Sequence, residues 1–208
     1  MRDPILLFGG LGSCSESREI GSSERLERGV TVLLEFEGTS PQVHESVFVA
    51  PGARIVGDVV IGPGSSVWYN AVIRGDVFPI RIGAQVNIQD LTMVHVTTGK
   101  WATTIEDKVT VGHNVTLHGC TLREGALIGM GSVVMDRADV GAYSIVGAGS
   151  LVTEGTVIPE GSLAMGSPAR VKRPLTPEEL AFVKQSAGHY ETLAERHRKS
   201  LDGSGGGE

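Results

Sequence analysis

An aliphatic residue recurs at close to every sixth position along most of the chain, and this spacing predicts the fold. The positions are Val49, Ile55, Ile61, Val67, Ile73, Ile82, Ile88, Val94, Val111, Leu117, Leu122, Ile128, Val134, Val140, Val146, Val152 and Ile158. A period of six matches neither a helix nor one long strand, but it fits short strands joined by a turn in every unit. Glycines follow many of these positions and supply the backbone freedom that such turns need. The pattern therefore predicts a β-solenoid.

The repeat resembles that of the hexapeptide-repeat family, whose left-handed parallel β-helix uses three six-residue faces, about 18 residues, per triangular coil. The repeat covers about residues 49–163, which predicts about six coils. We expect an all-β solenoid domain over residues 32–170. Residues 1–31 do not fit the repeat, and we predict a poorly ordered N-terminal extension there.

A different pattern follows the solenoid and predicts one α-helix over about residues 176–199. Thr176-Pro177-Glu178-Glu179 has the order of an N-cap, a first-turn proline and a capping-box acid. Side chains that can form an apolar stripe then follow at spacings of three and four: Leu180, Val183, Ala187, Tyr190, Ala194 and His197. We expect residues 171–200 to form a linker and a helix packed on the solenoid or on a neighbouring subunit. We predict a disordered tail at residues 201–208.

Composition excludes several classes of protein. The chain of 208 residues has no apolar run long enough to span a membrane. Its formal net charge is −6 with only 18 Lys and Arg, which argues against a nucleic-acid partner. The two cysteines, Cys14 and Cys120, cannot build a disulfide framework, and this is typical of a cytoplasmic protein.

Two histidines occupy equivalent places in the repeat. His95 directly follows Val94 and His118 directly follows Leu117, 23 residues apart. That separation equals one coil of 18 residues plus a five-residue excursion, for which residues 97–101 are available. The two side chains should lie on adjacent rungs, about 4.8 Å apart. Arg74, which directly follows Ile73, should extend the same column.

A third histidine should lie on another face. Asp90 and His113 are also 23 residues apart and form a second column by the same count. Two neutral imidazoles can bind one divalent cation, but a tight site needs a third ligand. If three solenoids pack around a threefold axis, the His113 face of one subunit can meet the His95 and His118 column of the next. The sequence therefore suggests an interfacial site of three histidines in a homotrimer.

The motifs that surround these histidines closely resemble those of γ-class carbonic anhydrases and their γ-like relatives. They are Ile73-Arg74-Gly75-Asp76, Asn87-Ile88-Gln89-Asp90, His95, Gly112-His113 and Leu117-His118-Gly119-Cys120. With the Gly166-Ser167-Pro168-Ala169 loop and the C-terminal helix, the resemblance covers about residues 32–198. It implies reversible hydration of CO₂ to bicarbonate by a metal-dependent lyase.

The resemblance also implies a role for each matching residue. His95 and His118 of one subunit and His113 of the next would bind Zn²⁺, or Fe²⁺ or Co²⁺. Gln89 is similar to the family residue that orients the attacking water. Arg74 and Asp76 resemble a pair that ties subunits together and lines the pocket, and Asn87 and Asp90 resemble supporting members of that wall. Tyr190 is similar to a pocket-lining tyrosine of some relatives, although a packing role fits it equally well.

The sequence departs from the archetypal enzyme of the family at the proton-transfer groups. Val77 stands where that enzyme has a glutamate, and residues 97–104 hold no carboxylate where it has an acidic loop. These differences leave other functions open. One alternative is a metal-binding or scaffold protein with weak or no activity. Others are hexapeptide acyl transfer, which needs no set of three histidines, and thioester hydrolysis at the same metal.

Overall fold

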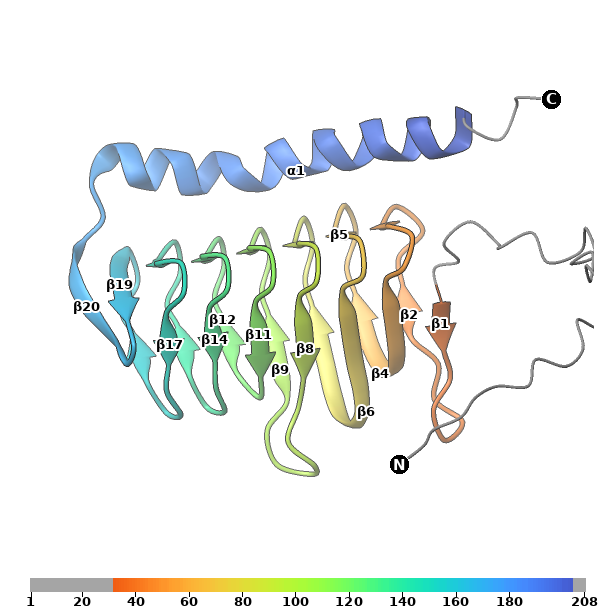
Figure 1. Cartoon of the computed structure of the whole chain (residues 1–208), viewed down its shortest axis with the longest axis horizontal. Coiled ribbons are helices and arrows are strands. Elements are labelled where there is room, and N and C mark those ends of the chain that lie inside the picture. The colour runs from red at the N-terminus through yellow and green to blue at the C-terminus, as the bar shows by residue number, and fades with distance from the viewer. Residues whose placement is uncertain (1–31, 204–208) are drawn as a thin grey trace, which may run out of the picture.

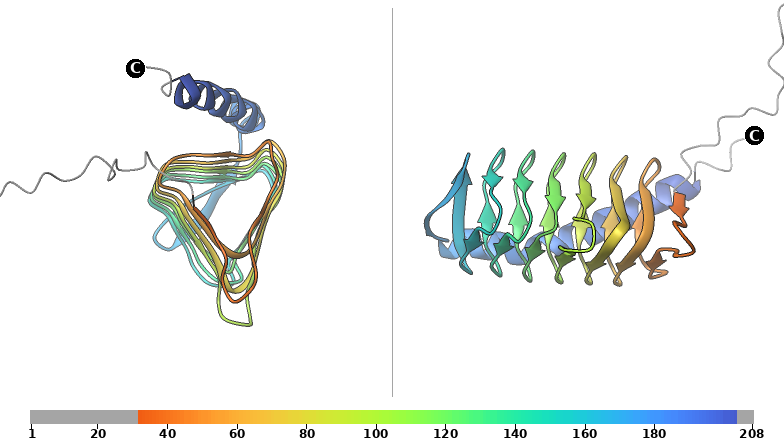
Figure 2. Two further views of the ribbon diagram at one scale, coloured as in Figure 1. Left: turned by 90° about the vertical axis from the view of Figure 1, so that its right-hand side faces the viewer. Right: turned by 90° about the horizontal axis from the view of Figure 1, so that it is seen from below.

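The computed structural model describes residues 32–203, which form a parallel β-solenoid with one long helix alongside. Viewed along its axis, the solenoid is a triangular prism, and the helix lies outside one of its three faces (Figures 1 and 2). The predicted fold class, an all-β solenoid with a C-terminal helix, is confirmed. Within residues 32–203, no helix has the length and apolar character that crossing a membrane requires.

Two faces of the prism belong to one twelve-stranded sheet. Its strands are β1 (Val32–Leu34), β2 (Gln42–Val43), β4 (Arg54–Ile61), β6 (Val72–Ile82), β8 (Met93–His95), β9 (Thr103–Ile105), β11 (Thr116–His118), β12 (Thr121–Leu122), β14 (Val133–Val134), β15 (Asp139–Val140), β17 (Leu151–Val152) and β18 (Val157–Ile158). The start of β6 pairs with β8 and its end pairs with β9, so this strand passes around a corner and joins the two faces.

The third face is an eight-stranded sheet. Its strands are β3 (Phe48–Val49), β5 (Ser66–Val67), β7 (Asn87–Ile88), β10 (Thr110–Val111), β13 (Leu127–Ile128), β16 (Ile145–Val146), β19 (Ser162–Gly166) and β20 (Ala169–Pro174). The strands from β3 to β19 are seven successive parallel neighbours, which correspond to about seven coils. The structure thus has about seven coils where the repeat predicted about six.

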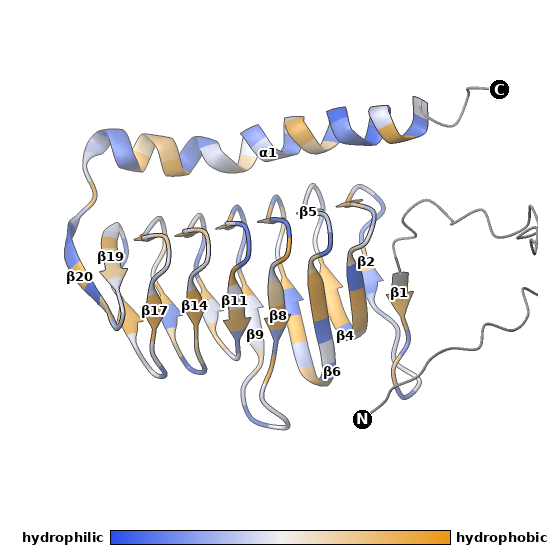
Figure 3. Ribbon diagram, viewed as in Figure 1, coloured by the Kyte–Doolittle hydropathy of each residue, from blue (hydrophilic) through white to orange (hydrophobic). Residues whose placement is uncertain are grey.

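The repeated aliphatic side chains form the core. All of the predicted positions except Val49 are buried, sixteen of seventeen, and Val49 is half-buried against the same core. In Figure 3, many of the strands are coloured as hydrophobic, and the turns between them are mostly white or blue. One aliphatic side chain per six residues fills a narrow interior with few aromatic rings, because each coil stacks on the next as a continuous column.

The departures from the six-residue period fall where the structure places an irregularity. The register between β4 and β6 shifts after Gly57, where Val59 pairs with Ile80, so residues 76–79 have no ladder partner. The excursion predicted at residues 97–101 is a loop closed by a bridge between Thr97 and Trp101, and it projects from the prism between β8 and β9 (Figure 1). Both irregularities lie beside the predicted histidine column.

The C-terminal boundaries differ from those predicted. Residues 169–174 form β20, which turns back antiparallel on β19 and closes the last coil, so the predicted linker begins as a strand. The helix α1 spans Pro177–Gly203, and residues 201–203, predicted as tail, extend it. No proline interrupts the helix before Gly203. The predictions for residues 1–31 and 204–208 lie outside the described residues.

Helix α1 lies along the eight-stranded sheet, as its apolar stripe predicts, and contacts β3, β5 and β7. Its predicted stripe is buried or half-buried throughout. Near the end of the helix, the His197 ring lies 5.0 Å from the Trp68 ring and its Nδ1 is 3.0 Å from the Tyr69 hydroxyl. His197 therefore fastens the helix to the first coils.

The predicted capping box is present at the start of α1 and has a pH-dependent effect. Glu179 accepts hydrogen bonds from Arg173 and from the Thr176 amide, and these lower its pKa from 4.5 to about 2. Since the folded-state pKa is depressed, this stabilisation is present above the ordinary value and is lost as pH falls towards the folded-state value. We expect Glu179→Gln to lower the urea midpoint near neutral pH, and the difference from wild type to shrink below about pH 4.5. Thr176→Ser, which keeps the cap, is the control, and a pH-independent difference would contradict the assignment.

Candidate metal centre

The structure places His95 and His118 directly opposite each other on adjacent strands. They are register partners in the β8–β11 ladder, which confirms the alignment predicted from their spacing. Nδ1 of His95 lies 3.3 Å from Nε2 of His118, and the ring centroids are 5.2 Å apart. Arg74, one residue after the Ile73–Val94 pair, begins the same column. We call Arg74, His95 and His118 the histidine column.

Each imidazole of the column is held from outside by a carboxylate. Nε2 of His95 is 3.0 Å from Oδ1 of Asp76, and Nδ1 of His118 is 2.7 Å from Oδ1 of Asp136. Arg74 donates to the other oxygen of Asp76. Asp76 lies in the unpaired stretch of β6, which lets its side chain reach the column. In this chain Arg74 and Asp76 pair with each other, and their predicted role between subunits stays a prediction.

Both carboxylates are ionised at neutral pH. Burial alone would raise the pKa of Asp76, but hydrogen bonds from His95 and Arg74 outweigh it and hold the pKa below its ordinary value. Burial opposes ionisation of Asp136 in the same way, and hydrogen bonds from Thr97 and His118 lower its pKa. An ionised carboxylate only accepts hydrogen bonds, so the outer nitrogen of each imidazole must carry the proton.

This arrangement fits a divalent cation. A neutral imidazole has one N–H, so the nitrogens that face each other present two lone pairs at 3.3 Å. Two lone pairs at that distance repel unless a cation, or a proton on one ring, lies between them. Two nitrogens that are each about 2.0–2.1 Å from one tetrahedral Zn²⁺ are separated by about 3.3–3.4 Å. The donor set and its spacing therefore match a metal that prefers imidazole.

His113 lies in a second group, away from the column. Its Nδ1 is 2.8 Å from Oδ2 of Asp90, which confirms the second predicted column. The bond to Asp90 leaves Nε2 as the nitrogen that can bind a ligand. The His113 side chain is 47% exposed and that of His118 is 37% exposed. Both side chains can therefore be reached from outside the chain.

Gln89, Asn87 and Tyr190 come together beneath α1. Nε2 of Gln89 donates to Oδ1 of Asn87 at 3.0 Å, and both side chains are buried. The Tyr190 hydroxyl is hydrogen-bonded to Gln89. Burial raises the pKa of Tyr190, and the charge of Asp90 adds to this effect, while the bond with Gln89 opposes it. Tyr190 also packs against the edge of Trp68, so it has the packing role as well as a contact with a predicted site residue.

The predicted residues thus form two groups on one subunit. One is the histidine column with Asp76, and the other contains Gln89, Asn87, Asp90, His113 and Tyr190, which we call the glutamine corner. Within residues 32–203, no side-chain hydrogen bond joins the two groups, and no group of three or more histidine, cysteine or acidic side chains is arranged to hold a metal ion.

Comparison with known proteins decides the family. The model of the bacterial transferase hexapeptide (six repeats) matches residues 40–75. The mitochondrial gamma carbonic anhydrase 2 of Arabidopsis thaliana is 47% identical over 179 residues, covering 84% of this chain and 64% of that protein. A carbonic anhydrase of Geobacillus kaustophilus is 50% identical over 155 residues, covering 74% of this chain and 85% of that protein. This chain belongs to the γ-carbonic anhydrase family.

Solved structures agree with this γ-carbonic anhydrase fold. A hexapeptide transferase family protein from Anaplasma phagocytophilum is 45% identical with a TM-score of 0.76, covering 79% of this chain and 96% of that chain. The chain spans slightly less than two thirds of the Arabidopsis protein, 64% of its length.

Asp136, which binds an imidazole of the histidine column, was not predicted from the sequence. Asp136 binds His118, yet its position, 18 residues after His118, is the spacing of one coil and so was available as a signal. Cys120, two residues after His118, has a buried, free thiol, and burial raises its pKa to about 12. A protonated, enclosed thiol is a poor metal ligand.

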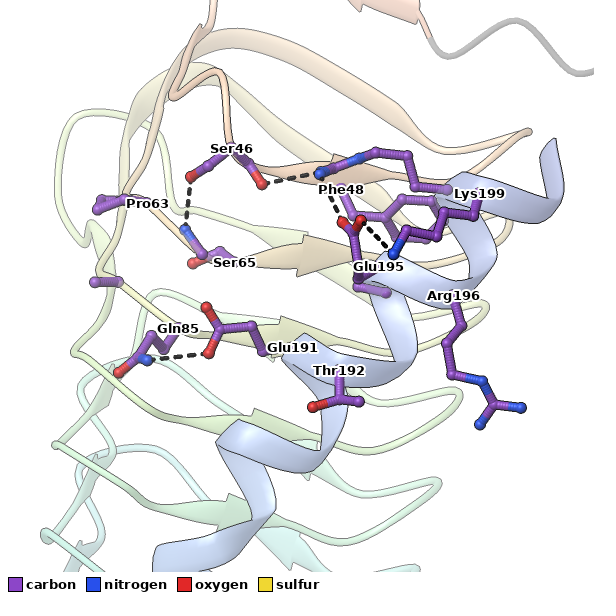
Figure 4. Close-up of a pocket in the computed structure, with 14 residues that line it drawn as sticks. Ser46, Phe48, Pro63, Ser65, Gln85, Glu191, Thr192, Glu195, Arg196 and Lys199 are labelled. Carbon is purple, nitrogen blue, oxygen red and sulfur yellow. Dashed lines mark hydrogen bonds and ion pairs between the residues drawn. The ribbon is translucent and has the colours of Figure 1, made fainter. Parts of the chain in front are cut away.

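A cleft of about 830 Å³ lies between α1 and the first coils, and it is separate from both groups (Figure 4). Gln85 donates to Glu191 across it at 3.2 Å, and Arg198 donates to the Ser46 carbonyl at 3.0 Å. None of the predicted site residues lines this cleft. Its polar groups fasten the helix to the coils, and we assign it no chemistry.

Proposed function

We propose that this protein catalyses the reversible hydration of CO₂ to bicarbonate at a metal site shared between subunits of a homotrimer. His95 and His118 of one subunit and His113 of the next bind Zn²⁺, and Fe²⁺ or Co²⁺ are alternative ions. The observation that carries the proposal is that Nδ1 of His95 and Nε2 of His118 face each other 3.3 Å apart. From the cysteine content we further propose a cytoplasmic location.

The division into two groups supports a shared site. The histidine column supplies only two imidazoles, and His113 is held by Asp90 with Nε2 free. A third ligand for the column must come from outside the subunit. In a cyclic assembly each subunit presents its column to one neighbour and its glutamine corner to the other, so every interface completes one site.

A divalent cation held by His95, His118 and the His113 of a neighbour would keep its full charge and would lower the pKa of water enough for attack on CO₂ near neutral pH, an effect for which carbonic anhydrases are the standard example. The chain's own residues orient the imidazole ligands and the attacking water. Asp76 and Asp136 fix the imidazole tautomers. Gln89, held by Asn87 and Tyr190, offers a rigid amide directly before Asp90, the residue that binds His113.

Release of the proton from the water needs an acceptor other than the residues of the histidine column and the glutamine corner. Both carboxylates at the column are engaged with histidines, and Val77 and residues 97–104 offer no other acid. We therefore expect hydration to accelerate with the concentration of an imidazole buffer, which carries the proton away.

A second candidate function is acyl transfer or thioester hydrolysis, favoured by the 45% identity to the hexapeptide transferase family protein. A catalytically weak scaffold is the third. The paired imidazoles favour the metal-dependent reaction over transfer, because a single histidine base suffices for acyl transfer.

His118→Ala tests the proposed function. We would purify wild type and variant anaerobically, quantify zinc and iron per subunit, and follow CO₂ hydration by stopped flow. We expect about one metal per subunit in wild type, and in the variant loss of metal and at least about a 10³-fold loss of hydration. His44→Ala, which alters an exposed histidine bonded to Ser46, is the matched control and should keep both.

The outcomes separate the candidates. Full metal occupancy without hydration in any buffer would favour the scaffold, or a thioesterase if a coenzyme A thioester is cleaved. A well-formed oligomer that takes up no metal would overturn the metal site itself.

A further inference from the structure

Asp136 lies one coil beyond His118, in the turn between β14 and β15, and both of its carboxylate oxygens are engaged. Oδ1 accepts from Nδ1 of His118 at 2.7 Å, and Oδ2 accepts from the Thr97 hydroxyl at 2.7 Å. The side chain is 23% exposed. A carboxylate bound on both sides cannot rotate without losing a charge-assisted hydrogen bond, so its orientation is set.

The Thr97 hydroxyl belongs to the loop between β8 and β9, and this loop is attached to the turn of Asp136 at a second point. The Arg137 guanidinium lies 5.3 Å from the centre of the Trp101 ring. Within the loop, the amide of Thr97 donates to the Trp101 carbonyl. The hydrogen bond from Thr97 to Asp136 and the stacking of Arg137 on Trp101 join this loop to the next coil. They fix the position of the loop on the prism.

Gly119 leaves the space that Asp136 needs. Its φ is +57°, and a Cβ added there would lie 2.2 Å from Oδ1 of Asp136 and 2.9 Å from Cβ of Trp101. A side chain at position 119 would therefore displace the carboxylate or the loop. The glycine directly after His118 allows the carboxylate to reach the imidazole.

We propose that Asp136, fixed by Thr97, is a positioning residue that holds the His118 ring with Nε2 directed at His95, and so sets the affinity for the metal. This inference rests on the proposed function, because it concerns the same site. The loop that lacks the family's acidic residues thus acts through its hydroxyl, by holding a carboxylate behind the ligand.

The experiment compares Asp136→Ala, Asp136→Asn and Thr97→Val with wild type as the full-length oligomer. Zn²⁺ and Co²⁺ affinities are measured by competition with a chromogenic chelator, and the Co²⁺ absorption spectrum reports ligand geometry. We expect Asp136→Ala to weaken metal binding about 10–100-fold and to change the Co²⁺ spectrum. Asp136→Asn keeps an oxygen acceptor for His118, and we expect it to restore most of the affinity.

Asp139→Ala is the matched control, because it removes a carboxylate on β15 that pairs with Arg123 and contacts neither histidine of the column. It should leave metal affinity and spectrum unchanged. Thermal unfolding of the metal-free proteins shows whether a variant alters the fold. If Asp136→Ala does not fold, Thr97→Val decides the question, and we expect severalfold weaker binding from it.

Wild-type affinity and an unchanged Co²⁺ spectrum in Asp136→Ala, or in Thr97→Val if the former does not fold, would overturn this inference and leave the proposed function intact. Absence of metal binding by wild type would overturn both. An equal loss in Asp139→Ala would show that Asp136 acts only through general stability, and this too would overturn the inference.

Discussion

His113→Ala and His118→Ala, each inactive alone, should regain about a quarter of the wild-type metal sites and CO₂ hydration when their subunits are dissociated and reassembled together. The reason is the division of ligands between the histidine column and the glutamine corner. The first variant keeps an intact column, and the second keeps His113. In a random cyclic assembly of equal amounts, about one interface in four joins these two intact halves.

The control for this experiment uses two variants in the same column. His95→Ala and His118→Ala each lack one of the two imidazoles that lie 3.3 Å apart on one subunit. No mixture of them contains a subunit with both, so we expect no recovery. Metal content and stopped-flow hydration are measured on the same samples. Recovery in the control mixture, or none in the first mixture, would contradict a site shared in this way.

Leu122→Ala should lower the free energy of unfolding by about 2–5 kcal/mol. Leu122 lies on β12 and is fully buried in the narrow interior of the solenoid. The coils above and below are tied by ladder hydrogen bonds, which restrict their collapse into the space that the substitution opens. The measurement is urea denaturation of the metal-free protein, so that metal binding does not contribute to the stability.

Val157→Ala on β18 is the comparison for Leu122→Ala. β18 belongs to the same sheet, but the Val157 side chain is 69% exposed, and we expect a change within about 0.5 kcal/mol. Equal effects of the two substitutions would show that the buried aliphatic column does not carry the stability of the solenoid.

The candidate site could be predicted from the sequence as far as the repeat could be counted. The 23-residue separation placed His95 opposite His118 and Asp90 beside His113, and the structure has both pairs. Counting coils gives the height of a side chain on the prism and the face that carries it. It does not give the direction of the side chain at a corner, where the ladder is interrupted.

Contacts made where the ladder is interrupted could not be predicted from the repeat and became clear only from the structure. Asp76 reaches His95 from the unpaired stretch of β6, and Thr97 reaches Asp136, 39 residues away in the sequence, from a loop outside the repeat. The strand β20 was missed for the same reason, because its side chains do not follow the six-residue period.

By itself, the sequence determined the solenoid, its core, the C-terminal helix and the alignment of the two histidines, because a regular period of aliphatic side chains has one register that buries them all. Only the tertiary structure decided which carboxylate holds each imidazole and where the Thr97 loop lies. These features depend on how turns and loops fold back on the prism, and non-periodic backbone geometry is not encoded in the spacing of hydrophobic residues.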